Sequence, residues 1–270
     1  MPAETEEKAA KILIGTSGFS YKEWKGPFYP EKLPDREMLR YYAASFPAVE
    51  INSTFYAIPR SENMEIMVKK TEGKLEFVVK AHQDLTHNRE KADEALPPFK
   101  AALKPLQDHK VLSCVLLQFP YSFHHNLKNR DHLAILGERM EEIPLVAEFR
   151  NKWWAQDKTF EFLRKQKIGY CCVDEPLLPG LMPPTAVATS PIGYVRFHGR
   201  NKEKWWKHEK AQERYDYLYT EDELKDWVVR IKALLPLVKK IFVFFNNHPR
   251  GQAAINALAM VKLMASTKPS

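Results

Sequence analysis

The sequence has few cysteines, and their positions exclude a disulfide framework. Cys114, Cys171 and Cys172 are the three cysteines among 270 residues, an odd number without the Cys-x-x-Cys spacing of a structural zinc site. All three lie in apolar runs of strand length, and the adjacent pair would point to opposite faces of its strand. We therefore expect the three thiols to be packed in the core.

Long apolar segments and targeting signals are also missing. No apolar run approaches the roughly 20 residues that span a bilayer, and residues 1–10 (MPAETEEKAA) lack the basic start and apolar stretch of a signal peptide. We expect a cytoplasmic protein without a membrane partner, with a disordered tail over residues 1–10 and one domain over residues 11–265. With 44% hydrophobic residues, the chain as a whole does not belong to the disordered class.

Short apolar runs alternate with amphipathic segments along the chain. Most of the runs are almost continuously apolar, as expected for parallel strands that are covered on both faces. The eight runs are Ile12–Thr16, Ala48–Asn52, Leu75–Lys80, Val111–Gln118, Leu145–Phe149, Gly169–Val173, Tyr194–His198 and Ile241–Phe245. Candidate helices lie between or after them, at residues 35–46, 61–73, 93–107, 127–142, 157–167, 220–235 and 250–264.

This alternation predicts an α/β protein with a single (β/α)₈ TIM barrel. Residues 175–192 contain five prolines and no helical period, so we expect a Pro-rich loop in place of the sixth helix. Thr220 and Glu223 have the spacing of a capping box and would open the helix that follows the seventh strand. The turn at Gly15–Gly18 lacks the Gly-x-Gly-x-x-Gly fingerprint of a dinucleotide-binding fold.

Seven of the eight predicted strands end in polar residues. A charged side chain in such a strand points into the barrel or lies at its rim, and barrel enzymes have their active sites at this end. We therefore predict a charged mouth with nearly balanced acids and bases, the structural alternative being a salt-bridged layer that only fills the core. The residues are Glu50, Asn52, Lys80, Gln118, Glu148, Arg150, Asp174, Arg196, His198, Asn246 and Asn247.

Acid–base groups are present in this set. Glu148 or Glu50 would act as a general base, and His198 as an acid or a base. Lys80 would bind an anion or, if it is desolvated, act as a Schiff-base nucleophile. The amides and the remaining acid are expected to contact the substrate, and these residues are Asn52, Gln118, Asp174, Asn246 and Asn247.

The charged mouth suits an anion better than a metal ion. Arg150 and Arg196 would hold a phosphate or a carboxylate. The acids and the histidine of the set could ligate a divalent ion, but one histidine ends a strand and the neighbouring cations would repel the metal. We therefore expect an anionic small molecule as ligand, with no metal and no other cofactor.

Loops beyond the strands add hydroxyl and aromatic groups. Ser17, Tyr21, Trp24 and Tyr56 are candidates for substrate contact, because aromatic rings around a polar pocket stack on sugars or bases. The alternative is that they pack the end of the barrel. Residues 199–214 contain six Lys or Arg residues around Trp205 and Trp206, a combination typical either of nucleic-acid binding or of a solvated lid. The sequence predicts no particular oligomeric state.

Several motifs occur in order over residues 11–262. They are Gly15–Tyr21 with Trp24, Gly26 and Phe28–Pro30, then Val49–Tyr56, Lys80 with Thr86–His87, Gln118–Pro120, Ala147–Arg150, Val173–Asp174, Tyr194–Gly199 and Phe245–Asn247. Together these motifs resemble the YecE-like family (domain of unknown function 72). The resemblance implies a TIM barrel, and it implies no settled reaction. The sequence differs from the family pattern at Phe19, where the family often has Trp, and at Asn151, where it tends to have His.

Three functions are compatible with these observations. The first is an enzyme, a hydrolase or an isomerase, that acts on a phosphorylated or carboxylated substrate by acid–base catalysis at the barrel mouth. The second is a nucleic-acid-binding or nucleic-acid-processing protein that uses the basic loop at 199–214; the net charge of +7 favours polyanions in general. The third is a barrel that binds a metabolite without catalysis.

Overall fold

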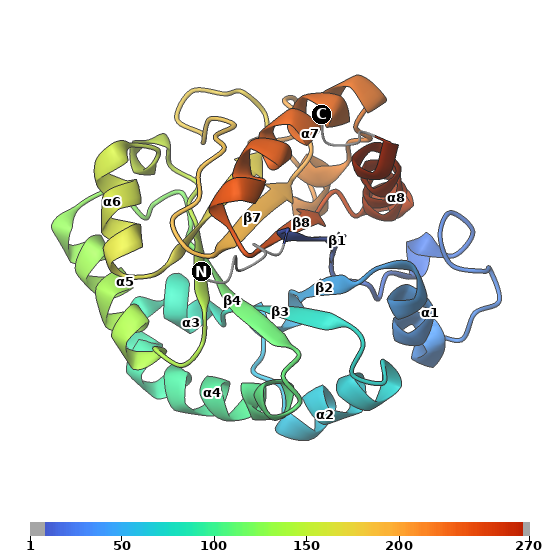
Figure 1. Cartoon of the computed structure of the whole chain (residues 1–270), viewed down its shortest axis with the longest axis horizontal. Coiled ribbons are helices and arrows are strands. Elements are labelled where there is room, and N and C mark those ends of the chain that lie inside the picture. The colour runs from blue at the N-terminus through green and yellow to red at the C-terminus, as the bar shows by residue number, and fades with distance from the viewer. Residues whose placement is uncertain (1–8, 267–270) are drawn as a thin grey trace, which may run out of the picture.

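Eight parallel strands close into a barrel in the order β1 to β8 (Figure 1). The computed structural model describes residues 9–266; the part of the predicted disordered tail at residues 1–8 lies outside them. Each predicted strand is present, with ends that differ by one or two residues from the apolar runs. The strands are β1 (Lys11–Ser17), β2 (Ala48–Ile51), β3 (Glu76–Lys80), β4 (Leu112–Gln118), β5 (Leu145–Glu148), β6 (Gly169–Asp174), β7 (Ile192–Phe197) and β8 (Lys240–Phe245).

Helices surround the strands and cover their outer face (Figure 1). No helix forms over residues 175–191, all of which the structure describes, so the predicted Pro-rich loop between β6 and β7 is confirmed. None of the described helices has the length and hydropathy that a membrane span requires. The helices are α1 (Met38–Ser45), α2 (Ser61–Lys70), α3 (Gln83–Thr86), α4 (Ala92–Asp108), α5 (Leu127–Arg139), α6 (Asp157–Lys165), α7 (Glu221–Leu234) and α8 (Gln252–Ser266).

Two helix starts illustrate how local chemistry sets the boundaries. The predicted capping box opens α7: the Thr220 hydroxyl accepts from the Glu223 N–H at 3.4 Å, and the Glu223 carboxylate accepts from the Thr220 N–H at 2.9 Å. The last helix begins later than predicted, because Arg250 has a left-handed φ of 55° and lies within a 3₁₀ turn at Pro249–Gly251 that precedes the helix. α8 therefore starts at Gln252.

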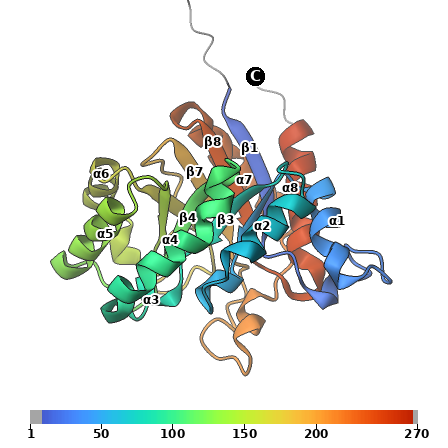
Figure 2. The ribbon, with the colours of Figure 1, turned by 90° about the horizontal axis from the view of Figure 1, so that it is seen from below.

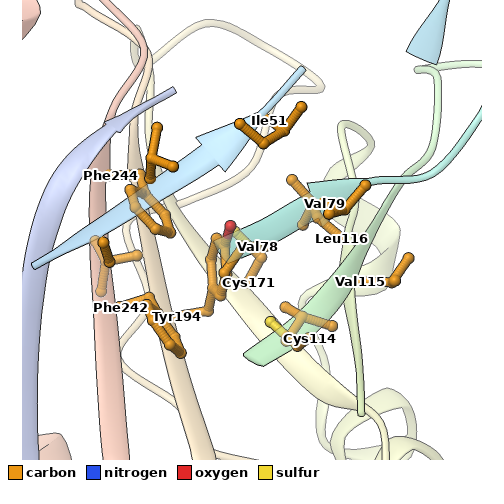
Figure 3. Close-up of a cluster of buried hydrophobic side chains, with 14 of the residues drawn as sticks. Ile51, Val78, Val79, Cys114, Val115, Leu116, Cys171, Tyr194, Phe242 and Phe244 are labelled. Atoms are coloured by element: carbon orange, nitrogen blue, oxygen red, sulfur yellow. The ribbon is translucent and has the colours of Figure 1, made fainter. Parts of the chain in front are cut away.

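The barrel interior is apolar in the half nearer the amino ends of the strands. Tyr194, Phe242 and Phe244 lie together there with the thiols of Cys114 and Cys171 (Figure 3), and all five are fully buried. The three cysteines of the described chain are free and buried, as predicted. Since period-two alternation places every second side chain of a strand on the same face, the residues two positions after Tyr194 and Phe244 also point inward. These are Arg196 and Asn246, which begin a polar layer.

A long loop projects from the carboxyl end of the barrel. It connects β7 to α7 over residues 198–220 and lies at the bottom of Figure 2, opposite the end at which β1 begins. A 3₁₀ turn at Ala211–Tyr215 folds part of this loop back over the mouth. The loop and the strand ends together enclose the site described next.

Candidate functional site

Arg196 links two buried carboxylates across the barrel. Its Nη2 atom donates to Glu50 Oε1 at 2.6 Å, and its Nη1 atom donates to Glu148 Oε2 at 2.5 Å. The Tyr194 hydroxyl donates to the second oxygen of Glu50 at 2.6 Å, and Ser17 Oγ accepts from Arg196 at 3.3 Å. These side chains are almost completely buried. The sequence prediction that β2, β5 and β7 bring their charges together is therefore confirmed.

Glu148 is the centre of this layer. Arg150 Nε lies 2.7 Å from its Oε1 atom, and His198 Nε2 lies 3.2 Å from the same oxygen. Neither contact meets the angular geometry of a hydrogen bond, so Arg150 makes a close charge contact with Glu148 and the His198 ring makes a close polar contact. Burial favours the protonated carboxyl, but Arg150, Arg196 and His198 outweigh it and hold the pKa of Glu148 well below its usual range. Glu148 is therefore an ionised carboxylate in close contact with Arg150, Arg196 and His198.

His198 is neutral in this arrangement. Burial and the charge of Arg150 lower its pKa to about 3, against the opposing effect of Glu148. The Asn246 amide lies 3.1 Å from His198 Nδ1 and can donate to it, which leaves the ring proton on Nε2, facing Glu148. The Nε2 side of the His198 ring therefore lies beside Glu148, while Asn246 holds the ring at its other nitrogen.

Lys80 ends β3 close to the ionic network around Arg196, but the surroundings of its ammonium group are different. Among residues 9–266 no carboxylate oxygen lies within the ion-pair distance of 4 Å from its ammonium group, which sits 4.1 Å from the centre of the Phe55 ring. Burial and Arg196 lower the pKa of Lys80 to about 7, with Arg150 adding to this effect and Glu148 and Glu50 opposing it. Lys80 is thus an amine that changes its charge near neutral pH.

A pocket of about 300 Å³ opens above Lys80. Its wall combines three cationic side chains with aromatic rings from four loops. The described lining residues include no Asp or Glu, because the carboxylates of Glu50 and Glu148 lie beneath the floor. The lining residues are Phe55, Tyr56, Lys80, His87, Gln118, Pro120, Tyr121, Arg150, Leu181, Trp205, Trp206, Arg214 and Tyr215.

The basic loop supplies the outer wall of this pocket. Trp205 is buried, whereas Trp206 is 55% exposed and meets the Tyr121 ring edge-on at the rim. Arg214 is held by His208 at 2.8 Å, and its buried Nε has no hydrogen-bond partner in the described chain. One of the two tryptophans is therefore packed and the other is available at the pocket entrance.

Glu175 belongs to the site and was not among the predicted residues. It follows β6, accepts from the Met182 N–H at 2.9 Å and lies 3.2 Å from Arg150 Nη1. Burial raises its pKa to about 7 despite the neighbouring arginine. The signal available in the sequence was its position one residue after a strand end, beside Asp174.

Asp174 itself lies elsewhere, which corrects its predicted place in the mouth. Its carboxylate accepts from Trp227 Nε1 and the Tyr219 hydroxyl, each at 2.6 Å, and from the Arg200 guanidinium. Cys171 on the same strand faces Glu148 in the interior. Three residues further on, Asp174 has the opposite orientation and points to the helix layer around α7.

Several other predicted contact residues pack the structure instead of lining the pocket. Asn247 donates to Tyr217 O and to Asn256, outside the polar layer. Trp24 is buried and donates to His248 O at 2.8 Å. Tyr21 donates to Ser17 O and stacks on the His248 ring.

The remaining predicted residues fall into three groups. Gln118 and Tyr56 line the pocket, together with Lys80 and Arg150. Glu50, Glu148, Arg196, His198, Asn246 and Ser17 form the layer beneath it. Asn52 follows β2, and its buried Oδ1 has no hydrogen-bond partner among residues 9–266.

A protein-built metal site is not evident at the mouth. Across residues 9–266, no three His, Cys, Asp or Glu side chains are grouped so that they could hold a metal ion. The acids that approach one another, Glu148 and Glu175, are each in contact with Arg150. The electrostatics of the open pocket are set by cations.

Comparison with known proteins assigns the family. Residues 13–270 match the model of the family described as "Protein of unknown function DUF72". The chain belongs to the DUF72 family. A curated relative, UPF0759 protein YunF of Bacillus subtilis (strain 168), is 34% identical over 94% of each chain. The resemblance to YecE-like proteins, another name for this family, is thereby confirmed.

Solved structures of DUF72 proteins have the same fold. One from Thermotoga maritima is 41% identical, with a TM-score of 0.88 over 95% of this chain and 100% of that one. Another from Enterococcus faecalis is 27% identical, with a TM-score of 0.85 over 96% and 97% of the two chains. These DUF72 structures support the TIM barrel and leave the chemistry to be argued from the pocket.

Proposed function

We propose that the mouth pocket binds a small anionic ligand, phosphorylated or carboxylated, and that the protein is an enzyme that acts on it by acid–base catalysis. One observation carries the proposal: Lys80, Arg150 and Arg214 line the pocket, and none of its other lining residues within 9–266 is acidic. A charge-assisted hydrogen bond to such cations is about twice as strong as a neutral one. An anion entering the pocket would therefore meet donors and no repulsive carboxylate.

The pocket walls strengthen this preference. Aromatic rings of Phe55, Trp205 and Tyr215 surround the cations and displace water from their vicinity. Coulombic attraction grows as the local dielectric constant falls below that of water. The volume of about 300 Å³ is at the small end of ligand sites in proteins, which favours a compact metabolite.

Within this proposal Lys80 moves the proton. An effective general base or acid has a pKa near the working pH, and the pKa of Lys80 is about 7. The sequence-predicted bases Glu50 and Glu148 are buried under the floor and bound by arginines. We therefore assign them a positioning role: they keep Arg150 and Arg196 oriented toward the mouth.

Titration with inorganic phosphate and with acetate tests the binding part of the proposal. Isothermal calorimetry on the full chain should show one site, and Arg214→Gln should weaken it by about 10- to 100-fold, the effect of losing one charged hydrogen bond. Lys202→Gln is the matched control, because Lys202 is an exposed cation of the same loop that does not line the pocket. Equal losses in the two variants, or no binding of either anion, would contradict the proposal.

Single-stranded nucleic acid is the second candidate ligand. The observation that favours it is the exposed Trp206 at the rim, next to the exposed Lys207. A base could stack on this ring while the backbone follows the lysines. In that case Lys207→Gln and Trp206→Ala would weaken oligonucleotide binding, and the affinity would fall steeply with salt. A small-anion site predicts no effect of Lys207→Gln on phosphate binding.

The third candidate is a barrel that binds a metabolite without turnover. One measurement distinguishes it from an enzyme. Lys80→Met would remove proton transfer but leave Arg150 and Arg214 in the pocket. For an enzyme, this variant should lose turnover of a bound substrate while retaining most of its affinity. For a non-catalytic barrel, the wild-type protein would leave the bound metabolite unchanged.

A further inference from the structure

We infer that Lys80 is an amine nucleophile and that the ligand of the mouth pocket is an aldehyde or ketone bearing a phosphate or carboxylate, which Lys80 binds as a Schiff base. The inference rests on the proposed function, since the cations of the same pocket would hold the anionic group. It adds the carbonyl group of the ligand and a covalent step, in which Lys80 acts as the nucleophile in place of the acid–base role given to it above.

The first observation is that Lys80 has no acidic partner. Other lysines at strand ends of this barrel are neutralised: Lys11 and Lys240 lie 2.7 and 2.8 Å from the Glu76 carboxylate at the opposite end. Arg150 and Arg196 are each within 3.2 Å of carboxylates. Across the described residues, the Lys80 amine has no such ion pair, although two glutamates lie in the layer below it.

The second observation is the place of the amine. Lys80 lines the mouth pocket, in which Arg150 and Arg214 supply positive charge and Gln118 supplies an amide. A carbonyl compound whose anionic end is bound by the arginines would have its remaining atoms close to Lys80. The anionic end also offsets the positive charge that a protonated Schiff base would add beside the arginines.

The protonation state of Lys80 supports nucleophilic attack. Burial and the charge of Arg196 lower its pKa to about 7, so about half of the amine is neutral at that pH. An ordinary lysine has fewer than about one neutral amine in a thousand at the same pH. The Phe55 ring favours the protonated form but does not provide the anionic partner that would lock it.

The covalent step is balanced without an oxidant or reductant. The neutral amine of Lys80 attacks the carbonyl carbon, forming the new C–N bond. The two hydrogens of the amine leave with the carbonyl oxygen as one molecule of water, and a C=N double bond remains. Protonation of its nitrogen gives the iminium form, which withdraws electrons from the adjacent carbon.

Reductive trapping tests this inference with a matched pair of aldehydes. Pyridoxal 5′-phosphate and pyridoxal carry the same carbonyl group, and only the first has a phosphate. With sodium cyanoborohydride present, hydride adds to the imine carbon and fixes the adduct as a secondary amine. We expect peptide mass mapping to place one main adduct on Lys80 and pyridoxal 5′-phosphate to react at least about tenfold faster than pyridoxal. Pyruvate provides the corresponding carboxylate arm.

Variants of the full chain separate site-specific from surface reaction. Lys80→Arg keeps the positive charge but removes the nucleophilic amine, so the main adduct should disappear. Lys74→Arg is the matched control, because Lys74 is a highly exposed lysine shortly before the same strand, and it should leave labelling of Lys80 unchanged. The rate on Lys80 should rise through about pH 7, where its amine loses its proton.

The outcomes distinguish this inference from the proposed function. Adducts spread evenly over surface lysines, or a Lys80 rate that rises only near the pKa of an ordinary lysine, would overturn it. If phosphate binds in the calorimetric titration but neither the phosphate nor the carboxylate probe is trapped on Lys80, the covalent step is wrong and the anion site stands. If neither anion binds and no adduct forms, both proposals fail.

Discussion

Replacing Arg196 by methionine should destabilise the fold by about 4 kcal/mol at neutral pH. Arg196 makes hydrogen bonds of 2.6 and 2.5 Å to Glu50 and Glu148, and all three side chains are buried. Breaking a buried ion pair by removing one partner costs about 3–5 kcal/mol, because an uncompensated charge remains. Methionine is unbranched and has no charged group, so the variant removes the charge and its hydrogen bonds while an apolar chain fills part of the space.

The contacts that Glu148 and Glu50 retain determine where the loss of stability falls within this range. Glu148 retains Arg150 at 2.7 Å and His198 at 3.2 Å, so its charge stays partly compensated. Glu50 retains the Tyr194 hydroxyl as its hydrogen-bond donor. Two carboxylates lose one arginine, but neither is left without any favourable contact. This argues against a loss far above 5 kcal/mol.

Urea unfolding followed by tryptophan fluorescence measures the loss. Arg214→Met removes an arginine from the loop above the pocket and serves as the control, with an expected effect below about 1 kcal/mol. Adding Glu50→Gln to Arg196→Met should recover part of the stability, since one of the orphaned charges is removed. A loss below about 1 kcal/mol for Arg196→Met, or no recovery in the double variant, would refute the description of this layer as a coupled ionic network.

Two further predictions concern the opposite end and the wall of the barrel. Burial opposes ionisation of Glu76, but hydrogen bonds from Lys11, a second lysine and a serine lower its pKa to about 2. Ionised Glu76 therefore stabilises the fold above about pH 4.5, and this effect is lost as the pH falls toward 2. Glu76→Gln should lower the free energy of unfolding in urea by about 1–2 kcal/mol at pH 7, a value reduced because solvent screens the exposed Lys11. The difference between the variant and the wild-type protein should shrink in acid. Gly15→Ala should cost about 3 kcal/mol or prevent folding, because a Cβ there would lie 2.1 Å from the Ala48 carbonyl oxygen. Gly137→Ala, with 3.6 Å of space in α5, should be neutral or stabilising, and equal thermal melts for the two alanine variants would contradict the argument.

Regular strand geometry explains why the polar layer could be predicted from the sequence. Parallel strands end at the same face, and residues two apart share an orientation. Glu50, Glu148, Arg196 and His198 follow this rule and meet in the structure. The first three lie within strands and His198 directly follows β7, so strand position is enough to place them.

The error at Asp174 arises from the same rule. The position of a residue at a strand end predicts its depth along the barrel axis. Whether its side chain points into the barrel or toward the helices depends on its distance in sequence from an inward-pointing residue: an even number of positions gives the same side, and an odd number gives the opposite side. Cys171 faces Glu148, so Asp174 faces outward to Trp227. Glu175 lies one residue after β6 and four positions from Cys171, so the same alternation turns it inward, where it contacts Arg150. Extending the strand pattern by one residue would have predicted it.

The outer wall of the pocket could not be predicted from periodicity. Arg214 and Tyr215 reach the mouth through a 3₁₀ turn in a long connection. That turn is held by tertiary contacts, including His208 to Arg214 and Asn201 to the Glu213 carbonyl. The density of lysine and tryptophan indicated a binding loop or a lid. It did not indicate which cation would enter the pocket.

Acidic and basic side chains lie at different depths in this barrel, and this difference determines which ligand charge the mouth prefers. The sequence contains nearly balanced acids and bases at its strand ends, which by itself favours no ligand charge. In the folded chain Glu50 and Glu148 are fully buried against Arg196, whereas Lys80, Arg150 and Arg214 reach the pocket. Glu148 holds Arg150 in place through a short contact, and no acidic side chain of the described lining opens into the cavity to compete for a ligand. Preference for an anion therefore follows from which side chains reach the pocket surface, and exchanging Arg214, which lines the pocket, should change that preference more than exchanging any lysine outside the pocket.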